Sequence, residues 1–262
     1  MHELALHHVG MRGQNKHVWR LRDVSLQWQV GERIGLIGRN GSGKTSLARL
    51  LCGLEHATTG RIRQRGGHGR VMCVMQRPEE HFLEATVRDE ILGYLHPYER
   101  DAPLHLLQQV ALDASFLTRS PRQLSTGEQR AVSIACGLAT HPTWLILDEP
   151  MAGLDAASRR QCLATLAAVS LQQTIGMCVI SHHPDDLLGW ANQLWALVEG
   201  TLRYDGPMAT IPLDVLIACT DPASPSLLRI LRQMASQDVA INPAIYDAVD
   251  AATIAALLEE HA

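Results

Sequence analysis

The chain has 262 residues, enough for one large α/β domain and a small additional segment but too few for two such domains. Hydrophobic residues make up 46% of it and charged residues 19%, which is the composition of a globular protein with an ample core. A net charge of −4 argues against a general nucleic-acid-binding protein, so no nucleic-acid partner is expected. The longest apolar runs are far shorter than the roughly 20 residues that cross a bilayer, so we expect no direct membrane span.

The cysteines and the N-terminus both favour a cytosolic protein. The six cysteines are scattered without a C-x-x-C pair and lie mostly in apolar stretches, which predicts reduced thiols in the interior. The first residues lack the basic region followed by an apolar stretch that marks a secretory signal.

The first part of the chain alternates between short strands and turns. Apolar residues alternate along residues 22–29, and residues 4–9 and 33–37 are also expected to be strands. The last of these strands enters a glycine-rich loop, after which residues 44–54 are expected to form a helix. Residues 60–75 return to strand and turn.

The second part of the chain alternates between helices and buried strands. Thr86 and Asp89 form an [ST]-x-x-[DE] capping box at the start of one helix, and residues 104–112 and 126–139 predict two more. Short apolar segments that follow helices predict parallel strands buried on both faces, at residues 144–147, 176–180 and 194–198.

The composition of the chain changes after Pro212. Prolines interrupt the chain there, and two segments rich in alanine and leucine, residues 226–234 and 243–260, predict helices. We therefore expect a main α/β domain over residues 1–210 and a C-terminal helical appendix over residues 211–262.

A glycine-rich loop follows the strand at residues 33–37. Residues 38–45 read Gly-Arg-Asn-Gly-Ser-Gly-Lys-Thr and fit the phosphate-loop pattern G-x-x-x-x-G-K-[ST]. Glycines let backbone N–H groups converge on phosphate oxygens, Lys44 should reach the β- and γ-phosphates, and Thr45 should offer its hydroxyl to Mg²⁺. The residues expected to hold the phosphates of ATP are Gly38, Arg39, Asn40, Gly41, Ser42, Gly43, Lys44, Thr45 and Ser46.

Two carboxylates end the apolar segment at residues 144–147. Open α/β sheets bind their ligands beyond the carboxyl ends of the strands, although a solvated surface pair is the alternative. Because the phosphate loop is present, we expect Asp148 to hold Mg²⁺, directly or through water, and Glu149 to polarise the attacking water. Glu149 is therefore the predicted catalytic residue.

The segment Leu124-Ser125-Thr126-Gly127-Glu128 lies between the phosphate loop and the carboxylate pair. With these three motifs in this order, residues 1–210 resemble the nucleotide-binding domain of ATP-binding cassette (ABC) proteins. The resemblance implies an ATPase with an α/β fold of the P-loop NTPase kind. It also implies a mostly parallel central sheet, an antiparallel β subdomain and an α-helical subdomain over about residues 77–140.

The resemblance assigns further catalytic and dimer residues. Gln76 matches the glutamine that senses Mg²⁺ and the attacking water, and His182 matches the switch histidine that holds the γ-phosphate and the catalytic glutamate. Asp155 ends the loop that crosses the dimer interface in this family. Two cassettes pair head to tail there, so Ser125 and Gly127 of one chain would meet the γ-phosphate on the other. The partner is either a second copy or a paralogous cassette.

Three features depart from the family pattern. Thr126 and Glu128 replace a glycine and a glutamine of the signature segment, and Arg130-Ala131 replaces a common Gln-Arg pair. Glu128 suits a helix N-terminus but repels nearby phosphate charge, so an altered turnover is expected. The family also stacks adenine on an aromatic residue at the end of the first strand, but residues 11–13, which align there, include no aromatic residue. Trp19 and His17 are the alternatives.

Residues 76–91 narrow the choice within the family. They resemble the Q-x-P-E-x-Q-F-x-x-x-T-V-x-D-E-I pattern of the ATPase subunits of energy-coupling factor (ECF) transporters, with His81 in place of a glutamine. This implies uptake of a vitamin or transition-metal ion through a transmembrane coupling subunit and a substrate-binding membrane subunit, from the cytoplasmic face of the cell membrane. Phe82 and Leu83 are candidates for the groove that receives the coupling helices, and the interior of the helical subdomain is the alternative.

Three other functions are alternatives to an ECF ATPase. A conventional importer with a separate binding protein is the nearest alternative. A soluble ABC protein acting on DNA or ribosomes commonly has two cassettes or a long insertion, whereas this chain has one motif set. A non-hydrolysing regulatory cassette is disfavoured because Lys44, Asp148, Glu149 and His182 are all present.

Overall fold

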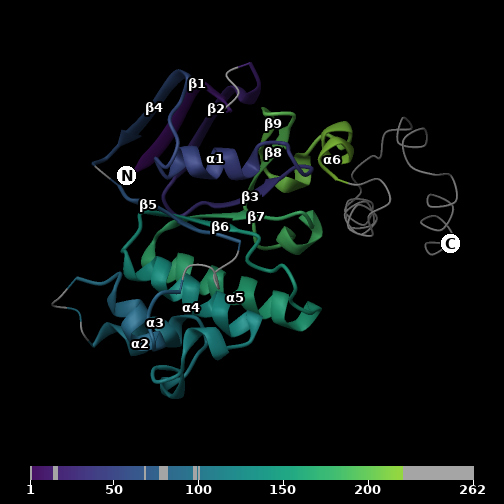
Figure 1. Ribbon diagram of the computed structural model, residues 1–262. Helices are drawn as coiled ribbons and strands as arrows, with labels where there is room; N and C mark the ends of the chain where they lie inside the picture. Colours follow the sequence, from purple (N-terminus) through teal and green to yellow (C-terminus); the bar gives the residue numbers. More distant parts are fainter. Residues whose placement is uncertain are drawn as a thin grey trace, which may run out of the picture.

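Two β-sheets and a group of helices make up the computed structural model (Figure 1). The structure describes residues 2–13, 17–67, 69–76, 82–96, 99 and 101–220. The two helices predicted over residues 226–234 and 243–260 lie outside these ranges, and so does His81. The division of the chain at residue 211 therefore stays a prediction.

The smaller sheet is antiparallel and has the order β2-β1-β4. Its strands are β1 (Glu3–Arg12), β2 (Trp19–Gln29) and β4 (Thr59–Arg65). Apolar residues alternate along β2, so one face of this strand is buried and the other is exposed, whereas β4 is exposed along its length. This sheet is the antiparallel β subdomain that the sequence resemblance implies.

The larger sheet has six strands, of which five are parallel. Its strands, in spatial order, are β5 (Val71–Val74), β6 (Trp144–Asp148), β7 (Gly176–Ile180), β3 (Arg33–Ile37), β8 (Gln193–Val198) and β9 (Thr201–Gly206). The edge strand β9 is antiparallel to β8. Parallel strands end at the same edge of a sheet, so the loops after β3, β5, β6 and β7 meet there.

The helices cover both faces of the larger sheet. In Figure 1, α1 (Lys44–Leu51) lies between the two sheets, and α4 (Thr126–Ala139) and α5 (Ala156–Gln173) lie on the opposite face. Two short helices, α2 (Val87–Leu92) and α3 (Ala102–Gln109), pack against α4 and complete the helical subdomain. The last described helix, α6 (Leu213–Cys219), packs beside β8. No helix within the described ranges is long and apolar enough to cross a membrane.

Single turns of 3₁₀-helix complete the described elements. They lie at Ala114–Phe116, Pro121–Gln123, Pro184–Leu187 and Met208–Thr210. Thr86 caps α2 as predicted, since its hydroxyl oxygen accepts a hydrogen bond of 3.1 Å from the Asp89 N–H.

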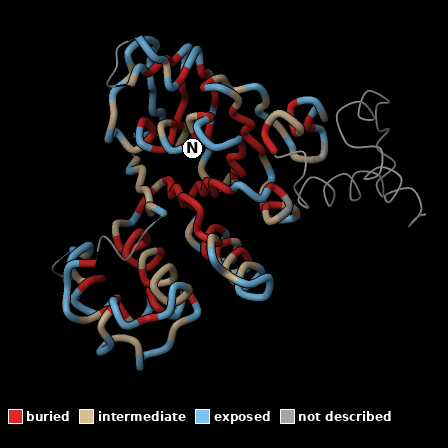
Figure 2. The backbone as a smooth tube through the Cα atoms, turned by 45° about the vertical axis from the view of Figure 1, so that its right-hand side comes forward, coloured by how far each residue is buried: buried red, intermediate tan, exposed pale blue. Residues whose placement is uncertain are grey.

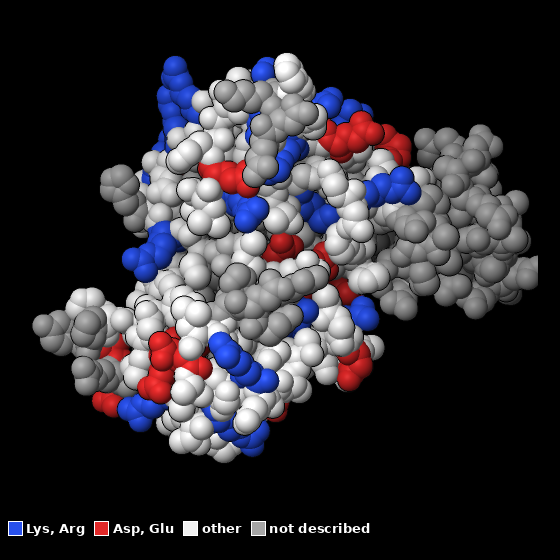
Figure 3. Space-filling view, viewed as in Figure 1, with Lys and Arg blue, Asp and Glu red and all other residues white. Residues whose placement is uncertain are grey.

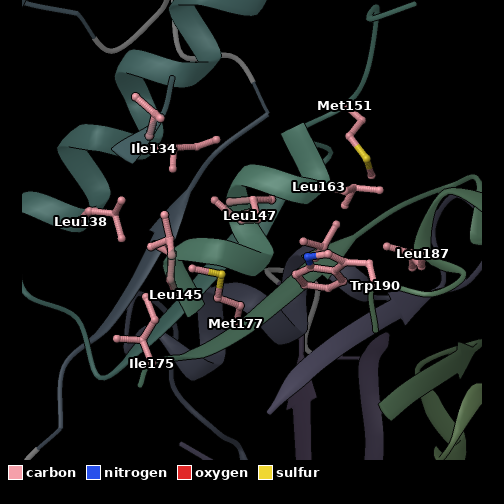
Figure 4. Close-up of a cluster of buried hydrophobic side chains, with 14 of the residues drawn as sticks. Ile134, Leu138, Leu145, Leu147, Met151, Leu163, Ile175, Met177, Leu187 and Trp190 are labelled. Atoms are coloured by element: carbon pink, nitrogen blue, oxygen red, sulfur yellow. The ribbon is translucent and has the colours of Figure 1, made fainter. Parts of the chain in front are cut away.

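The four central strands of the larger sheet, β6, β7, β3 and β8, are buried on both faces, as Figure 2 shows for the centre of the molecule. Alternate residues of β6 enter different hydrophobic clusters: Ile146 packs with α1 and the small sheet, whereas Leu145 and Leu147 pack with α4 and α5. Figure 4 shows the second cluster, with Leu145, Leu147 and Met177 of the strands among Ile134 and Leu138 of α4 and Leu163 of α5. Burial on both faces explains why these strands appear in the sequence as continuous apolar runs.

Three tryptophans fill the space between the two sheets. Trp28, Trp144 and Trp195 are each completely buried, and the Trp28 ring lies 6.3 Å from that of Trp144 and 5.7 Å from that of Trp195, centroid to centroid. We expect Trp28→Ala to lower the free energy of unfolding by about 3–5 kcal/mol, because it removes a large buried ring and leaves a cavity. Urea unfolding measures this loss.

The matched control for Trp28 is Leu83, whose side chain is 82% exposed. Leu83→Ala should change the stability by no more than about 0.5 kcal/mol. A Trp28→Ala variant as stable as this control would show that the Trp28 ring does not stabilise the packing between the two sheets.

Candidate functional site

The loop between β3 and α1 has the backbone of a phosphate-binding loop. Its three glycines, Gly38, Gly41 and Gly43, have φ angles of 155°, 79° and 105°, a region that other residues rarely adopt. A Cβ atom on Gly43 would lie 2.8 Å from the carbonyl oxygen of Arg20. The loop therefore favours glycine at these positions, and it leads directly into α1, whose N-cap is Gly43.

Lys44 is folded into this loop. Its Nζ donates hydrogen bonds to the carbonyl oxygens of Gly38 at 2.7 Å and Arg39 at 3.1 Å. Burial lowers the pKa of Lys44, while the negative charges of Glu149 and Asp148 raise it in opposition. A buried cation is thus held at the mouth of the loop, where it can meet an anion.

Two carboxylates stand at the end of β6, next to the loop. Asp148 and Glu149 are each 6% exposed, and the hydroxyl of Thr45 donates to Asp148 Oδ2 at 3.1 Å. Burial, and then the charge of Asp148, raise the pKa of Glu149 to about 7, and burial raises the pKa of Asp148 as well. Buried carboxyls with a raised pKa are typical of functional sites.

His182 follows β7 and faces Glu149. Its Nε2 lies 3.1 Å from Glu149 Oε1, although this buried oxygen accepts no well-directed hydrogen bond within the described chain. Burial lowers the pKa of His182, and the charge of Lys44 lowers it further. The contact therefore suits a neutral imidazole, and Glu149 Oε1 is left able to accept a proton from a third group.

The loop, the carboxylates and His182 surround one hollow of about 620 Å³. Figure 3 shows acidic and basic groups near the centre of this face, between the small sheet and the helical subdomain. The predicted residues that line the hollow are Asn40, Gly41, Gly43, Lys44, Thr45, Ser46, Gln76, Asp148, Glu149 and His182. The remaining loop residues, Gly38, Arg39 and Ser42, join it through the backbone of the same loop.

Thr45, Gln76 and Asp148 offer oxygen atoms of the kind that bind magnesium. The Thr45 hydroxyl donates a hydrogen bond to the Asp148 carboxylate, and Gln76 lines the same hollow. Hydroxyl, amide and carboxylate oxygens are the ligands that Mg²⁺ takes, and Glu149 Oε1 adds a buried acceptor nearby. The described residues contain no cluster of three or more His, Cys, Asp or Glu that would suit a different metal.

Two parts of the site were not predicted from the sequence. The turn between β8 and β9 supports the loop, since the Gly200 N–H donates to the Ser42 carbonyl at 2.9 Å. Gly200 has a φ of 80°, and the Glu-Gly pair between two apolar strands was the signal that could have identified this turn. The second unpredicted contact comes from α4, where Arg130 donates a hydrogen bond to the carbonyl of Glu149.

Trp19 is the aromatic residue at this hollow. It lines the hollow together with Arg20 and Arg22, and the guanidinium of Arg12 lies 4.4 Å from the centroid of its ring. Met11 is 1% exposed and belongs to the core. Trp19 therefore lines the hollow, whereas Met11 at the first-strand position does not.

Three predicted residues lie apart from the phosphate loop. Ser125 and Gly127 line a second hollow of about 540 Å³ beside α4 and α5, and Asp155 is exposed and caps α5 through a 2.8 Å bond from the Ser158 N–H. Ser125 caps α4, and its N–H and hydroxyl both donate to Glu128 Oε2, at 2.7 and 2.8 Å. Within one chain, the signature segment therefore does not reach the phosphate loop.

Comparisons with known proteins agree with this geometry. The sequence model of the ABC transporter family matches residues 21–152. Over 244 residues, the chain is 29% identical to a Methanosarcina mazei protein provisionally named an ABC transporter ATP-binding protein, covering 88% of this chain and 83% of the relative. It is 30% identical to the energy-coupling factor transporter ATP-binding protein EcfA1 of Listeria monocytogenes, covering 78% of each.

Two further matches are an ATP-binding protein of iron import and a solved structure with the same fold. The chain is 30% identical to the Fe(3+) ions import ATP-binding protein FbpC of Pseudomonas fluorescens, over 71% of this chain and 56% of that protein. The solved structure of cbiO1 from Clostridium perfringens, part of the transporter complex cbiONQ, superimposes with a TM-score of 0.72 at 21% identity, covering 89% of this chain and 96% of that one. The chain therefore belongs to the ABC transporter family, in which it is an ATP-binding cassette ATPase.

Proposed function

We propose that this chain is the ATP-hydrolysing subunit of an ABC importer, and that it acts as one of two cassettes paired head to tail. The observation that supports the proposal best is the single hollow shared by Lys44, Thr45, Asp148, Glu149 and His182. Each of these side chains has the chemistry that ATP hydrolysis requires at its position.

The phosphate loop and its neighbours would bind MgATP. Lys44 would exchange its two carbonyl partners for β- and γ-phosphate oxygens, and the loop N–H groups would surround the same anion. Thr45, Gln76 and Asp148 would hold Mg²⁺, which supplies charge neutralisation at the phosphates when it is bound. Trp19 would stack on the adenine.

Glu149 would act on the attacking water. Its buried Oε1 lacks a well-directed hydrogen bond, and burial raises the pKa of the carboxyl to about 7, so the ionised group is a stronger base than a solvated carboxylate. His182 lies 3.1 Å from this oxygen and would hold the carboxylate and the γ-phosphate in place. The carboxylate would orient the water and accept its proton as the water oxygen bonds to the γ-phosphorus and the bond from the γ-phosphorus to the bridging oxygen breaks, releasing ADP.

The position of the signature segment supports the head-to-tail pair. Ser125 and Gly127 present an N–H group, a hydroxyl and the start of a 14-residue helix, which together favour an anion, but they line a different hollow from the phosphate loop of their own chain. A second cassette that faces this one would bring its ATP to the segment. The partner would be a second copy or a paralogous cassette.

A groove on the helical subdomain is the proposed docking site for the transmembrane partner. The groove has a volume of about 410 Å³ and is lined by both Phe82 and Leu83. Leu83 is 82% exposed, whereas Phe82 is 4% exposed and also packs in the subdomain interior. The buried carboxylate of Glu90 fixes this loop by accepting 2.9 Å hydrogen bonds from the N–H groups of Leu83 and Glu84. Leu83 is thus held in place at the rim.

We further propose that the importer is of the ECF type, for a vitamin or transition-metal ion. The pattern of residues 76–91 supports this choice, and relatives of both ECF and iron-import types match at similar identity. A conventional binding-protein-dependent importer is the second candidate. The cassette would then lie at the cytoplasmic face of the membrane through its partners.

Purification from membranes tests this function. The tagged chain is expected to co-purify with an integral membrane protein, and a Leu83→Cys variant is expected to crosslink to it. Recovery with a small substrate-binding membrane subunit supports the ECF type, and recovery with a soluble binding protein supports the alternative. Recovery with ribosomes or DNA would rule out transport.

Glu128 should compete with the γ-phosphate for the signature donors. Because its carboxylate occupies the N–H and hydroxyl of Ser125, Glu128→Gln removes a negative charge from the place where phosphate must bind. We expect the ATP concentration for half-maximal dimerisation to fall about two- to fivefold, as measured by light scattering in the Glu149→Gln background. A requirement for more ATP would show that Glu128 supports the closed pair instead.

A further inference from the structure

Arg130 joins the signature helix to the main chain of the proposed catalytic residue. It lies on α4, five positions after Ser125, and its guanidinium donates a hydrogen bond to the carbonyl oxygen of Glu149. Arg130 also lies beside Asp148 and Pro150, which line a small cavity with it. The helical subdomain therefore touches the end of β6 at the residue whose carboxylate faces the hollow.

The backbone of Glu149 needs such support. Its φ angle of 53° places a non-glycine residue in the left-handed region, a strained conformation that persists only where the surroundings hold it. The Glu149 N–H donates to the carbonyl oxygen of Ile180 at 3.1 Å, and the Glu149 carbonyl oxygen accepts from the Ala152 N–H at 3.2 Å. Arg130 supplies a second hydrogen bond to the Glu149 carbonyl oxygen. Within the described residues, it is the only hydrogen bond to this carbonyl that comes from the helical subdomain.

We propose that Arg130 is a positioning residue for ATP hydrolysis, which holds the Glu149 main chain so that its carboxylate stays aimed at the attacking water. The proposal rests on the proposed role of Glu149. Arg130 touches no reacting atom. It acts because a rotation of the peptide after Glu149 would displace the carboxylate, and a misplacement of about 1 Å can reduce a rate by 10²-fold.

Arginine suits this task because a charged donor forms a stronger bond to a carbonyl than a neutral one. The bond spans two parts of the fold, from α4 of the helical subdomain to the end of β6. Methionine at this position would fill similar space without a donor. Lysine would keep the charge and can still donate, but from an ammonium group on a shorter, more flexible side chain.

Two variants and a control test the proposal through kcat, KM and dimer formation. Arg130→Met should lower kcat by about 10- to 100-fold with the KM for ATP within about twofold of the wild type. Arg130→Lys should recover part of the lost kcat. Arg122→Met is the control, because Arg122 also donates to a carbonyl of the helical subdomain, that of Phe82, but lies away from Glu149. Its kcat should stay within about twofold of the wild type.

The same substitution in the Glu149→Gln background separates positioning from a structural role. If Arg130 acts only through Glu149, then Arg130→Met in that background should leave the ATP-dependent dimer unchanged. A kcat of Arg130→Met equal to that of Arg122→Met would overturn the proposal, because Arg130 would then have no role in hydrolysis. A raised KM or a weakened ATP-bound dimer would also overturn it, because Arg130 would then support α4 instead. Should Arg130→Met not fold, Arg130→Lys carries the test, with a several-fold fall in kcat at constant KM expected.

Failure of the proposed function would look different. A wild-type chain without ATPase activity, or a Glu149→Gln variant with normal turnover, would remove the role of Glu149 on which the inference rests. A wild type that hydrolyses ATP through Glu149 but does not respond to Arg130→Met would leave the proposed function intact and contradict the inference alone.

Discussion

Replacing Glu149 by glutamine is expected to lower kcat for ATP hydrolysis by about 10²–10⁴-fold, the usual contribution of a general base. Glutamine has nearly the same shape but cannot accept the proton of the attacking water. The pKa of Glu149, raised to about 7 mainly by burial, shows that the pocket opposes its negative charge. Neutralising the side chain should therefore keep or increase the stability of the fold while turnover is lost.

Steady-state phosphate release and nucleotide binding measure the two effects separately. Glu149→Gln should bind ATP with a Kd within a few-fold of the wild type, because the carboxylate acts on water and not on the phosphates. Glu84→Gln removes a carboxylate from an exposed position and should hydrolyse ATP normally. A Glu149→Gln variant that keeps more than about a tenth of the wild-type turnover would rule out Glu149 as the catalytic base.

Replacing Lys44 by alanine is expected to weaken ATP binding by about 10- to 100-fold. Hydrogen bonds between charged groups contribute about 1.5–3 kcal/mol, and Lys44 carries the cation that lies at the mouth of the loop. Burial already lowers the pKa of Lys44, so the charge is held there at a cost to folding. The loss should thus appear in binding and not in stability.

Fluorescent-nucleotide titration and thermal unfolding check the Lys44 prediction. Lys44→Ala should show the weaker Kd together with a Tm close to that of the wild type. Arg49→Ala is the control, because Arg49 is an exposed residue in the last turn of the same helix and pairs with Glu55. ATP binding by Lys44→Ala that equals binding by Arg49→Ala would contradict the proposed role of the loop.

Much of the fold follows from local patterns that depend on one segment at a time. The strands Arg33–Ile37 and Gly176–Ile180 and the helix Thr126–Ala139 have the predicted bounds, because apolar runs, caps and glycines mark their ends. The grouping of Lys44, Asp148 and His182 in one hollow follows from the meeting of parallel strand ends at one edge. Motif order was sufficient for this part of the site.

Other features depend on contacts that no local pattern encodes. The antiparallel strand β9 was not predicted, and its turn supports the phosphate loop only because β8 lies next to β3. Phe82 and Leu83 are neighbours of similar polarity, yet one is buried and the other exposed, since Glu90 fixes the loop between them and α2. The contact from Arg130 to Glu149 joins residues 19 positions apart through the packing of α4.

The mass of the Glu149→Gln chain in solution, with and without nucleotide, tests the central claim most directly. The head-to-tail arrangement predicts that the mass doubles with MgATP and not with MgADP, and that a further Gly127→Asp substitution prevents the doubling because it places a negative charge where the γ-phosphate of the partner must bind. A Glu149→Gln chain that binds ATP but remains a monomer, or that dimerises equally with Gly127→Asp, would contradict a composite site made by two copies of this chain.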